Sequence, residues 1–257
     1  MSKKYLKMLN IKSIKTQVIL FLVIFSLGLS LPDKNVSFLF SAGICLVCSI
    51  LFELFFLVIK KKPLIFPESA VITGLILGLV LASNQPKYVY VLAAFLAIGS
   101  KQIIRIKEKH IFNPAAFGIL LTTLLLHANT QWLGTYLWYV LAPVGLYFIY
   151  KLRKLELLIS YLVTATLLWT IQSLIQKINP LYVFGYLSYF FIFIMLIEPK
   201  TTPITKLGKI IFGILVGVTI FILTQIGIRF DAELASLLLA NTMVVFLNNL
   251  KTKKKEV

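Results

Sequence analysis

Residues 36–62 read VSFLFSAGICLVCSILFELFFLVIKKK, a long apolar run with one charged residue, Glu53, that ends in Lys60, Lys61 and Lys62. About 20 consecutive apolar residues are enough for a helix to cross the hydrocarbon core of a bilayer. Lysines directly after such a run are typical of its cytoplasmic end. This stretch therefore predicts a membrane-spanning helix whose carboxyl end lies in the cytoplasm.

The rest of the chain has the same character. Of its 257 residues, 59% are hydrophobic and only 14% are charged, whereas about a quarter of the residues are charged in soluble domains. The net charge of +17 comes from short basic groups between apolar runs, which favours a lipid bilayer over nucleic acid as the partner. We therefore exclude a water-soluble enzyme and predict an all-α polytopic membrane protein that does not bind nucleic acid.

Ten apolar segments can be distinguished, and the positions of the basic residues support this number. The segments lie near residues 16–31, 36–59, 69–83, 88–104, 112–128, 132–150, 155–176, 181–197, 209–228 and 232–250. All but four of the 26 Lys and Arg fall on alternate flanks of these segments, the exceptions being Lys34, Lys87, Lys177 and Arg229. Because cytoplasmic flanks are enriched in Lys and Arg, we predict about ten transmembrane helices, two cytoplasmic termini and a location in the plasma (cell inner) membrane.

The lengths of the segments suggest that the chain consists of two halves. Segments 69–83 and 112–128 are short, and 181–197 and 232–250, each five segments further along, are also on the short side; segments 16–31 and 88–104 are short as well. Short segments in corresponding positions of two halves are typical of inverted repeats around a central site. We expect one membrane domain, 1–257, made of inverted five-helix halves at roughly 15–128 and 132–250 and of basic cytoplasmic tails at 1–14 and 251–257.

Two features within the apolar segments could be functional. Asn113-Pro114 is a typical helix start, because Asn caps free N–H groups and Pro suits the first turn. Alternatively, a helix that begins within the membrane points its positive end at an anion or a cofactor. Glu53 lies about two helical turns before the lysines, and a charge in the membrane usually marks an ion or proton path. Alternatively, Glu53 extends toward Lys60–Lys62 or stays protonated.

No set of residues indicates a catalytic centre. His110 and His127 fall at opposite membrane faces in this topology, and the chain has neither a Ser–His–Asp pattern nor a glycine-rich phosphate loop. We therefore expect no catalytic residues and no metal site. Whether the protein is a non-catalytic subunit or one that carries electrons stays open.

Several strings of the sequence resemble motifs of one known family. They are Glu68-Ser69-Ala70-Val71-Ile72-Thr73-Gly74-Leu75, Lys101-Gln102, Phe112-Asn113-Pro114-Ala115-Ala116-Phe117-Gly118, Glu198-Pro199-Lys200-Thr201, the stretch 208–217, and Leu237-Leu238-Leu239-Ala240-Asn241. In this order they are similar to motifs of the NqrB/RnfD family, the membrane subunits of the sodium-pumping NADH–quinone reductase and of Rnf electron-transport complexes. The chain is identified as a short, divergent member.

The resemblance implies a ten-helix fold of inverted halves that is related to ammonium and urea channels. It also implies a role in flavin-linked electron transfer coupled to Na⁺ or H⁺ translocation, with other subunits of a redox complex as partners. The residues expected to bind a cofactor are Ser69, Thr73, Asn113, Ser188 and Thr201, and those expected along an ion pathway are Glu53, Asp231 and Asn241.

One departure from the family concerns the flavin. Family members with covalent FMN attach it to Thr in a Ser-x-Ala-Thr motif, in a long loop after the Phe-Asn-Pro-Ala helix. This motif is absent here, the loop shrinks to His127–Gln131, and a second, similar stretch is replaced by Gly185-Tyr186-Leu187-Ser188. We therefore expect a non-covalent flavin, FMN or riboflavin, if any. The fold would also suit a stand-alone channel or carrier for a small solute such as a flavin, or a membrane scaffold for a flavoprotein.

Overall fold

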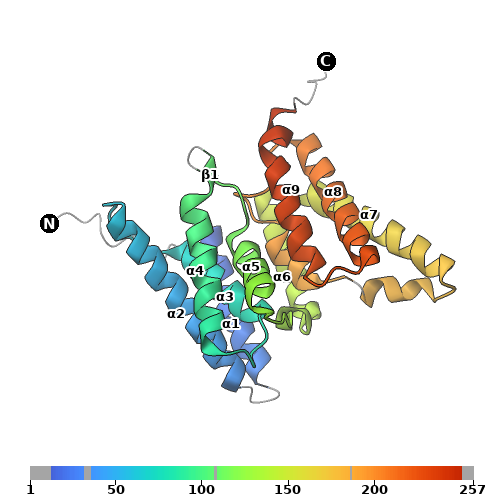
Figure 1. The fold of residues 1–257 in the computed structure, drawn as a ribbon. Coiled ribbons are helices and arrows are strands. Elements are labelled where there is room, and N and C mark those ends of the chain that lie inside the picture. Colours follow the sequence, from blue (N-terminus) through green and yellow to red (C-terminus); the bar gives the residue numbers. More distant parts are fainter. Residues whose placement is uncertain (1–12, 32–35, 107–108, 186, 251–257) are drawn as a thin grey trace. The chain divides into compact units, whose positions relative to one another are not determined.

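The computed structural model describes residues 13–31, 36–106, 109–185 and 187–250, and these are mostly helical. The chain forms two compact units, Met1–Arg105 with Pro114–Leu137 and Ile106–Asn113 with Trp138–Val257. Figure 1 shows the order of the elements along the chain. The predicted tails 1–14 and 251–257 lie almost entirely outside the described residues, as does Lys34.

The first unit is built around one short, buried helix. Its elements are α1 (Ile14–Ser30), α2 (Val36–Ile59), α3 (Glu68–Val80), α4 (Lys87–Ile103), α5 (Pro114–Leu126) and the 3-10 turn η1 (Leu133–Thr135). Helix α3 packs against α1, α2, α4 and α5. Every residue from Thr73 to Val80 is buried, so α3 has no side exposed to lipid and forms the core of its unit.

Two glycines of α3 allow this close packing. A Cβ atom at Gly78 would lie 2.6 Å from the Cα of Ala42, and one at Gly74 would lie 2.7 Å from the Cα of Leu46. Both distances are too short for non-bonded carbon atoms. Small residues let helix backbones approach closely in membrane proteins, where packing rather than hydrophobic burial drives association. The glycines therefore fix how α2 and α3 meet.

The ends of the short helices in this unit are satisfied by backbone pairing. Leu81 forms an antiparallel bridge with Thr130. The N–H of Ala82 donates to the carbonyl of Asn129 at 3.0 Å, and the N–H of Gln131 donates to the carbonyl of Val80 at 2.8 Å. Because unsatisfied backbone groups are costly in a bilayer, this pairing explains how α3 and α5 can be shorter than a full crossing.

The second unit repeats several neighbour relations of the first. Its elements are α6 (Trp138–Leu152), α7 (Leu155–Ile175), the 3-10 turn η2 (Pro180–Gly185), the π-helical turn η3 (Phe191–Met195), α8 (Lys206–Ile226) and α9 (Ala232–Asn249), preceded by β1 (Arg105–Ile106) and β2 (Lys109–His110). For this comparison we count α6, α7, η3, α8 and α9 as the first to fifth elements of the second unit. In each unit the first element then packs against the second and the third, the second packs against the fourth, and the fourth packs against the fifth.

The predicted segment 181–197 is the one that differs most from expectation. It contains η2 and, further along, η3 with a π-helical turn, instead of one continuous helix. Gly185 ends the first turn, and the π turn lies against α6, where a Cβ at Gly145 would clash with Phe193. The ring of Phe193 and its neighbours thus occupy the core of the unit in place of a longer helix, as Phe190, Phe191 and Met195 are fully buried.

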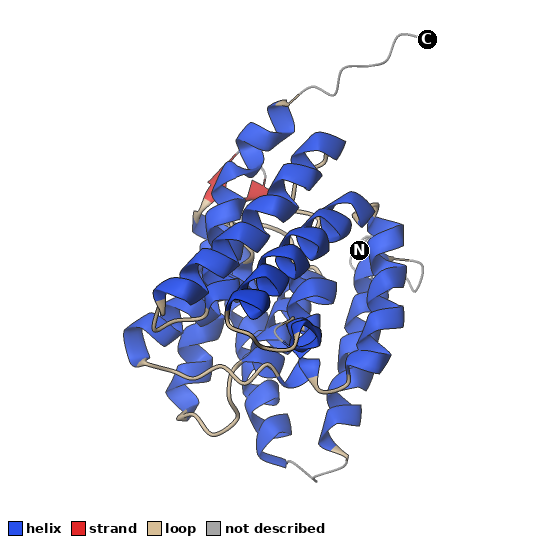
Figure 2. Ribbon diagram, turned by 90° about the vertical axis from the view of Figure 1, so that its right-hand side faces the viewer, coloured by secondary structure: helices blue, strands red, loops and turns tan. Residues whose placement is uncertain are grey.

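Among the described residues, four helices are long and apolar enough to cross a membrane. They span Ser37–Ile59, Leu155–Ile175, Lys206–Ile226 and Ala232–Asn249. Shorter apolar helices cover Ile14–Ser30, Glu68–Val80, Pro114–Leu126 and Trp138–Leu152. Figure 2 shows how little of the described chain is strand. The structure is thus that of a helical, multi-pass membrane protein.

Candidate functional site

A buried network of asparagine side chains lies within the second unit. The Oδ1 atom of Asn241, on α9, accepts from the backbone N–H of Asn113 at 2.9 Å. Its Nδ2 donates to the carbonyl of Thr201 at 2.9 Å, and the Nδ2 of Asn113 donates to the carbonyl of Met195 at 3.4 Å. Asn113 and Asn241 are 2% and 0% exposed. Buried amides must be hydrogen-bonded, and here they connect α9 with three other segments.

The conformation of the loop that follows η3 is stabilised by an acidic residue of that loop, Glu198. Oε1 of Glu198 lies 3.3 Å from Nε2 of His110 on β2, and Oε2 accepts from the hydroxyl of Thr201 at 3.2 Å. The hydroxyl of Thr202 donates to the carbonyl of Glu198 at 2.7 Å. His110 is buried, with a side chain that is 4% exposed. The Glu-Pro-Lys-Thr string therefore forms a compact turn that is attached to the β-hairpin.

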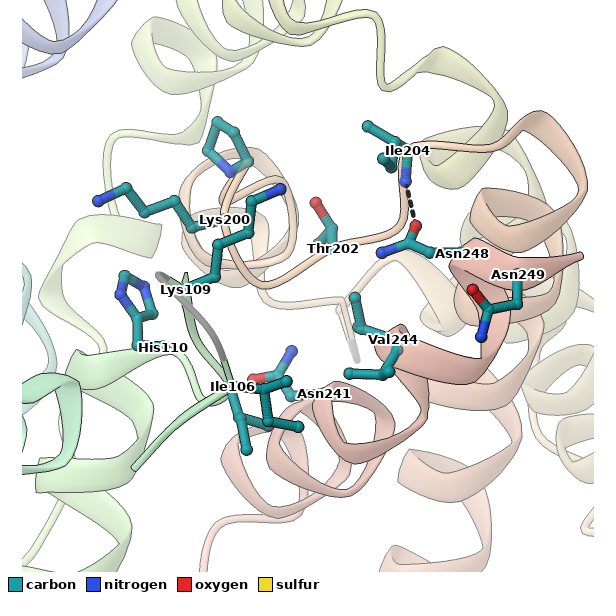
Figure 3. Close-up of a pocket in the computed structure, with 13 residues that line it drawn as sticks. Ile106, Lys109, His110, Lys200, Thr202, Ile204, Asn241, Val244, Asn248 and Asn249 are labelled. Atoms are coloured by element: carbon teal, nitrogen blue, oxygen red, sulfur yellow. Dashed lines mark hydrogen bonds between the residues drawn. The ribbon is translucent and has the colours of Figure 1, made fainter. Parts of the chain in front are cut away.

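A cavity of about 490 Å³ opens beside this turn, and we call it the α9 cavity. It is lined by Ile106, Lys109, His110, Ile111, Pro199, Lys200, Thr202, Ile204, Asn241, Val244, Val245, Asn248 and Asn249. In Figure 3, Lys109, Lys200 and His110 lie on one side, and Asn248 and Asn249 on the other. Its volume is within the range of about 300–1,000 Å³ that is typical of sites for small molecules and cofactors.

The first unit contains a buried ion pair. Oε2 of Glu53 on α2 lies 2.8 Å from Nζ of Lys101 on α4, and their side chains are 12% and 8% exposed. Lys60 instead donates to the carbonyl and to Oε1 of Gln102, each at 2.9 Å. Among the described residues, the ion-pair partner of Glu53 is thus Lys101 and not one of Lys60–Lys62.

The second unit contains an ion pair between the corresponding elements. Nζ of Lys209 on α8 lies 3.0 Å from Oε2 of Glu156 on α7 and donates to the carbonyl of Arg153 at 2.6 Å. Nearby, Lys154 donates to the carbonyl of Pro203 at 2.8 Å. Burial, with the charge of Lys209 adding to it, lowers the pKa of Lys154 to about 8, against a smaller opposite effect of Glu156.

The structure brings some of the predicted site residues together and separates others. Asn113, Thr201 and Asn241 meet in the network of the second unit. Ser69 and Thr73 belong to the first unit, where the hydroxyl of Thr73 donates to the carbonyl of Ser69 at 2.9 Å. These two are neighbours within α3.

The remaining predicted residues have local roles. Asp231 caps α9, with its Oδ1 accepting from the N–H groups of Glu233 and Leu234 at 3.1 and 3.0 Å. Ser188 accepts from the N–H of Phe191 at 3.4 Å and also hydrogen-bonds Glu233. Ser188 and Asp231 thus both lie at the start of α9, about 15 Å along the helix from Asn241 at 1.5 Å per residue.

Sequence reasoning missed three residues that matter for these sites, Lys109, His110 and Asn248, which had no motif of their own. Lys101 was noted as part of a family string, but its pairing with Glu53 was not foreseen. The contact between His110 and Glu198 joins residues 88 positions apart. The one available signal was that Lys101 directly precedes Gln102 within an apolar segment, where an unpaired lysine would be costly.

One protein family matches this chain along almost its whole length. The NQR2, RnfD, RnfE family matches residues 5–139 and 124–256. The D subunit of the ion-translocating oxidoreductase complex of Buchnera aphidicola subsp. Baizongia pistaciae (strain Bp) is 38% identical over 60 residues. This alignment covers 23% of the present chain and 17% of that protein, so the matched stretch spans less than a fifth of the relative.

Proposed function

Because the chain belongs to the NQR2, RnfD, RnfE family, we propose that it is an integral membrane subunit of a flavin-linked electron-transport complex that translocates Na⁺ or H⁺. The observation that carries this proposal is the family match, which extends over residues 5–139 and 124–256. The name of the Buchnera relative, which places that protein in an ion-translocating oxidoreductase complex, supports it. Other subunits of the complex would bring the electron donor and acceptor.

The fold proposed with this function consists of two inverted five-helix halves. In both units, elements at corresponding positions along the chain pack against each other. In both, a Glu on the second helix and a Lys on the fourth element form an ion pair, at 2.8 Å and 3.0 Å. The glutamates lie near the end of α2 and at the start of α7. Because an inversion places equivalent positions on opposite sides of the membrane, the shared packing order supports the proposed halves, whereas the two ion pairs do not occupy equivalent positions.

The ion pathway is proposed to pass Glu53. Of the three residues predicted for it, Glu53 has the setting that fits best, because its carboxylate is nearly buried between two helices and paired with Lys101. Charged side chains within membrane segments pair with one another and mark ion paths. The side chain of Asn241 forms hydrogen bonds through both its Oδ1 and its Nδ2 atom, and that of Asp231 caps α9. Both side chains therefore already have a structural role.

The flavin is proposed to bind non-covalently beside Asn113, Asn241 and Thr201. The residues there fit such a group, because a flavin has a flat apolar ring system with an edge of hydrogen-bonding atoms. The α9 cavity combines the apolar Ile106, Ile204 and Val245 with amide and ammonium donors. When bound, the flavin would supply the electron-transfer chemistry. The chain's own residues would hold its ring and exclude water from it.

The function can be tested by purifying the tagged chain from its own membranes in a mild detergent. We expect other subunits of a redox complex to co-purify, and flavin to leave the protein on denaturation. In proteoliposomes, oxidation of the electron donor should drive ion uptake. The double variant Glu53→Gln/Lys101→Met, which leaves no buried charge unpaired, should strongly reduce uptake with the complex still assembled. Glu68→Gln is the matched control, since Glu68 forms only a longer, 3.7 Å, surface pair with Lys15. Purification of the chain alone, without redox partners, would contradict the proposal.

A further inference from the structure

The ionisable side chains that line the α9 cavity are all basic residues. Lys109, Lys200 and the buried His110 line it, and there is no Asp or Glu among the described residues that form its wall. The adjoining Glu198 already accepts from the hydroxyl of Thr201 and contacts His110. A ligand in the cavity therefore contacts basic side chains, whereas the adjoining carboxylate of Glu198 already has partners within the protein.

The amide of Asn248 adds a donor whose orientation is fixed. Its Oδ1 accepts from the backbone N–H of Ile204 at 2.8 Å. An amide whose oxygen is held in this way must turn its NH₂ group elsewhere. In Figure 3 the nitrogen of Asn248 is directed away from Ile204, toward the side of the cavity where Thr202 lies. The cavity thus presents hydrogen-bond donors from two opposite sides.

The cavity also has an accessible apolar part. Ile106, Ile204 and Val245 line it and are 44%, 68% and 45% exposed. Such surface is available to a ligand that carries an apolar group next to its anionic one. A purely inorganic ion would leave this part of the wall without a partner.

From these features we propose that the α9 cavity binds a phosphate-bearing amphiphile. Lys109, Lys200 and the NH₂ of Asn248 hold the phosphate, and Ile106, Ile204 and Val245 contact the apolar part. Ammonium groups and amide donors are standard partners of phosphate oxygens. The phosphate group can belong to FMN or to the headgroup of an anionic phospholipid. The inference rests on the proposed function only where the ligand is a flavin.

The flavin arm of the test compares FMN with riboflavin, which differ only in the phosphate. The full-length protein is placed in phosphatidylcholine nanodiscs, and binding is followed by the quenching of flavin fluorescence. We expect FMN to bind about tenfold more tightly, the effect of one charge-assisted hydrogen bond. The double variant Lys109→Gln/Lys200→Gln should remove this preference. Lys206→Gln should keep it, because Lys206 is an exposed lysine outside the cavity wall.

The lipid arm measures, by native mass spectrometry, the retention of phosphatidylglycerol against phosphatidylcholine on the detergent-purified protein. Retention of phosphatidylglycerol that is lost in the double variant and kept in Lys206→Gln supports the inference with a lipid as the source of the phosphate, even if no flavin binds. Equal binding of FMN and riboflavin, without any lipid preference, overturns the inference and leaves the proposed flavin role intact. No preference for phosphate in either arm overturns it as well.

Discussion

At the scale of single residues, Asn241 takes part in the buried network of the second unit through both polar atoms of its amide. One side chain accepts from the N–H of Asn113 and donates to the carbonyl of Thr201. Both partners are backbone groups of buried residues, 2% and 1% exposed. Buried backbone groups without a partner cost about 1–3 kcal/mol each, so one amide on α9 satisfies two such groups.

Asn241→Ala should therefore destabilise the protein by about 2–6 kcal/mol, since two buried backbone groups lose their partner at once. The measurement is the free energy of unfolding in detergent, or the melting temperature as its substitute. Asn249→Ala is the control, because Asn249 is an exposed amide on the same helix. An equal, small effect of both substitutions would show that the network does not hold the loops.

Only part of this site could be predicted from the sequence. Asn113-Pro114 indicated the start of a helix, and α5 does begin at Pro114. Asn241 was noted only through its resemblance to a family motif. That Asn241 and Asn113 bond to each other, 128 residues apart, depends on how several loops and a helix pack, and no local pattern encodes such a contact.

At the scale of elements, each unit joins its second and fourth elements by one Glu–Lys pair. Glu53 and Lys101 join α2 and α4, and Glu156 and Lys209 join α7 and α8. Breaking a buried pair leaves one charge without compensation, which costs about 3–5 kcal/mol, whereas removing both charges can be neutral. The buried Glu53–Lys101 pair therefore helps to specify which faces of α2 and α4 meet, whereas Glu156 is one-third exposed.

Lys101→Met should lower the stability of the protein by about 3–5 kcal/mol, because it leaves the carboxylate of Glu53 buried alone. The double variant Glu53→Gln/Lys101→Met should recover most of this loss, and together with the single variant Glu53→Gln it gives the coupling energy of a double-mutant cycle. Lys15→Met serves as the control, since Lys15 is half exposed and 3.7 Å from its acid. A double variant no more stable than Lys101→Met would exclude the pairing.

The bounds of most helices followed from hydropathy and from the basic flanks. The predicted segments 36–59, 155–176 and 232–250 correspond to α2, α7 and α9 within one or two residues at each end. Segment 181–197 could not be predicted, because the length of an apolar run does not show whether it forms a membrane crossing or a short turn buried among other helices.

At the scale of the whole molecule, the alternation of basic flanks predicts the orientation of the chain. The loop after α2 and the turn between α6 and α7 carry Lys61 and Lys154, whereas Lys87 and Lys177 lie on flanks with a single basic residue. Because Lys and Arg accumulate on the cytoplasmic side, reporter fusions at Lys61 and Lys154 should read inside. Those at Lys87 and Lys177 should read outside. A reversed signal at any one of these sites would require a different number of crossings.

The pairing of Val80 and Ala82 with Asn129 and Gln131 has a consequence for the biosynthesis of the protein. When α3 leaves the translocon, the chain that will satisfy its carboxyl end is still on the ribosome. The segment then needs water, lipid headgroups or an insertase to cover its open backbone groups. Helix α3 can reach its final, fully hydrogen-bonded position only after synthesis has passed Gln131. The helices of the first unit therefore fold together and not one after another.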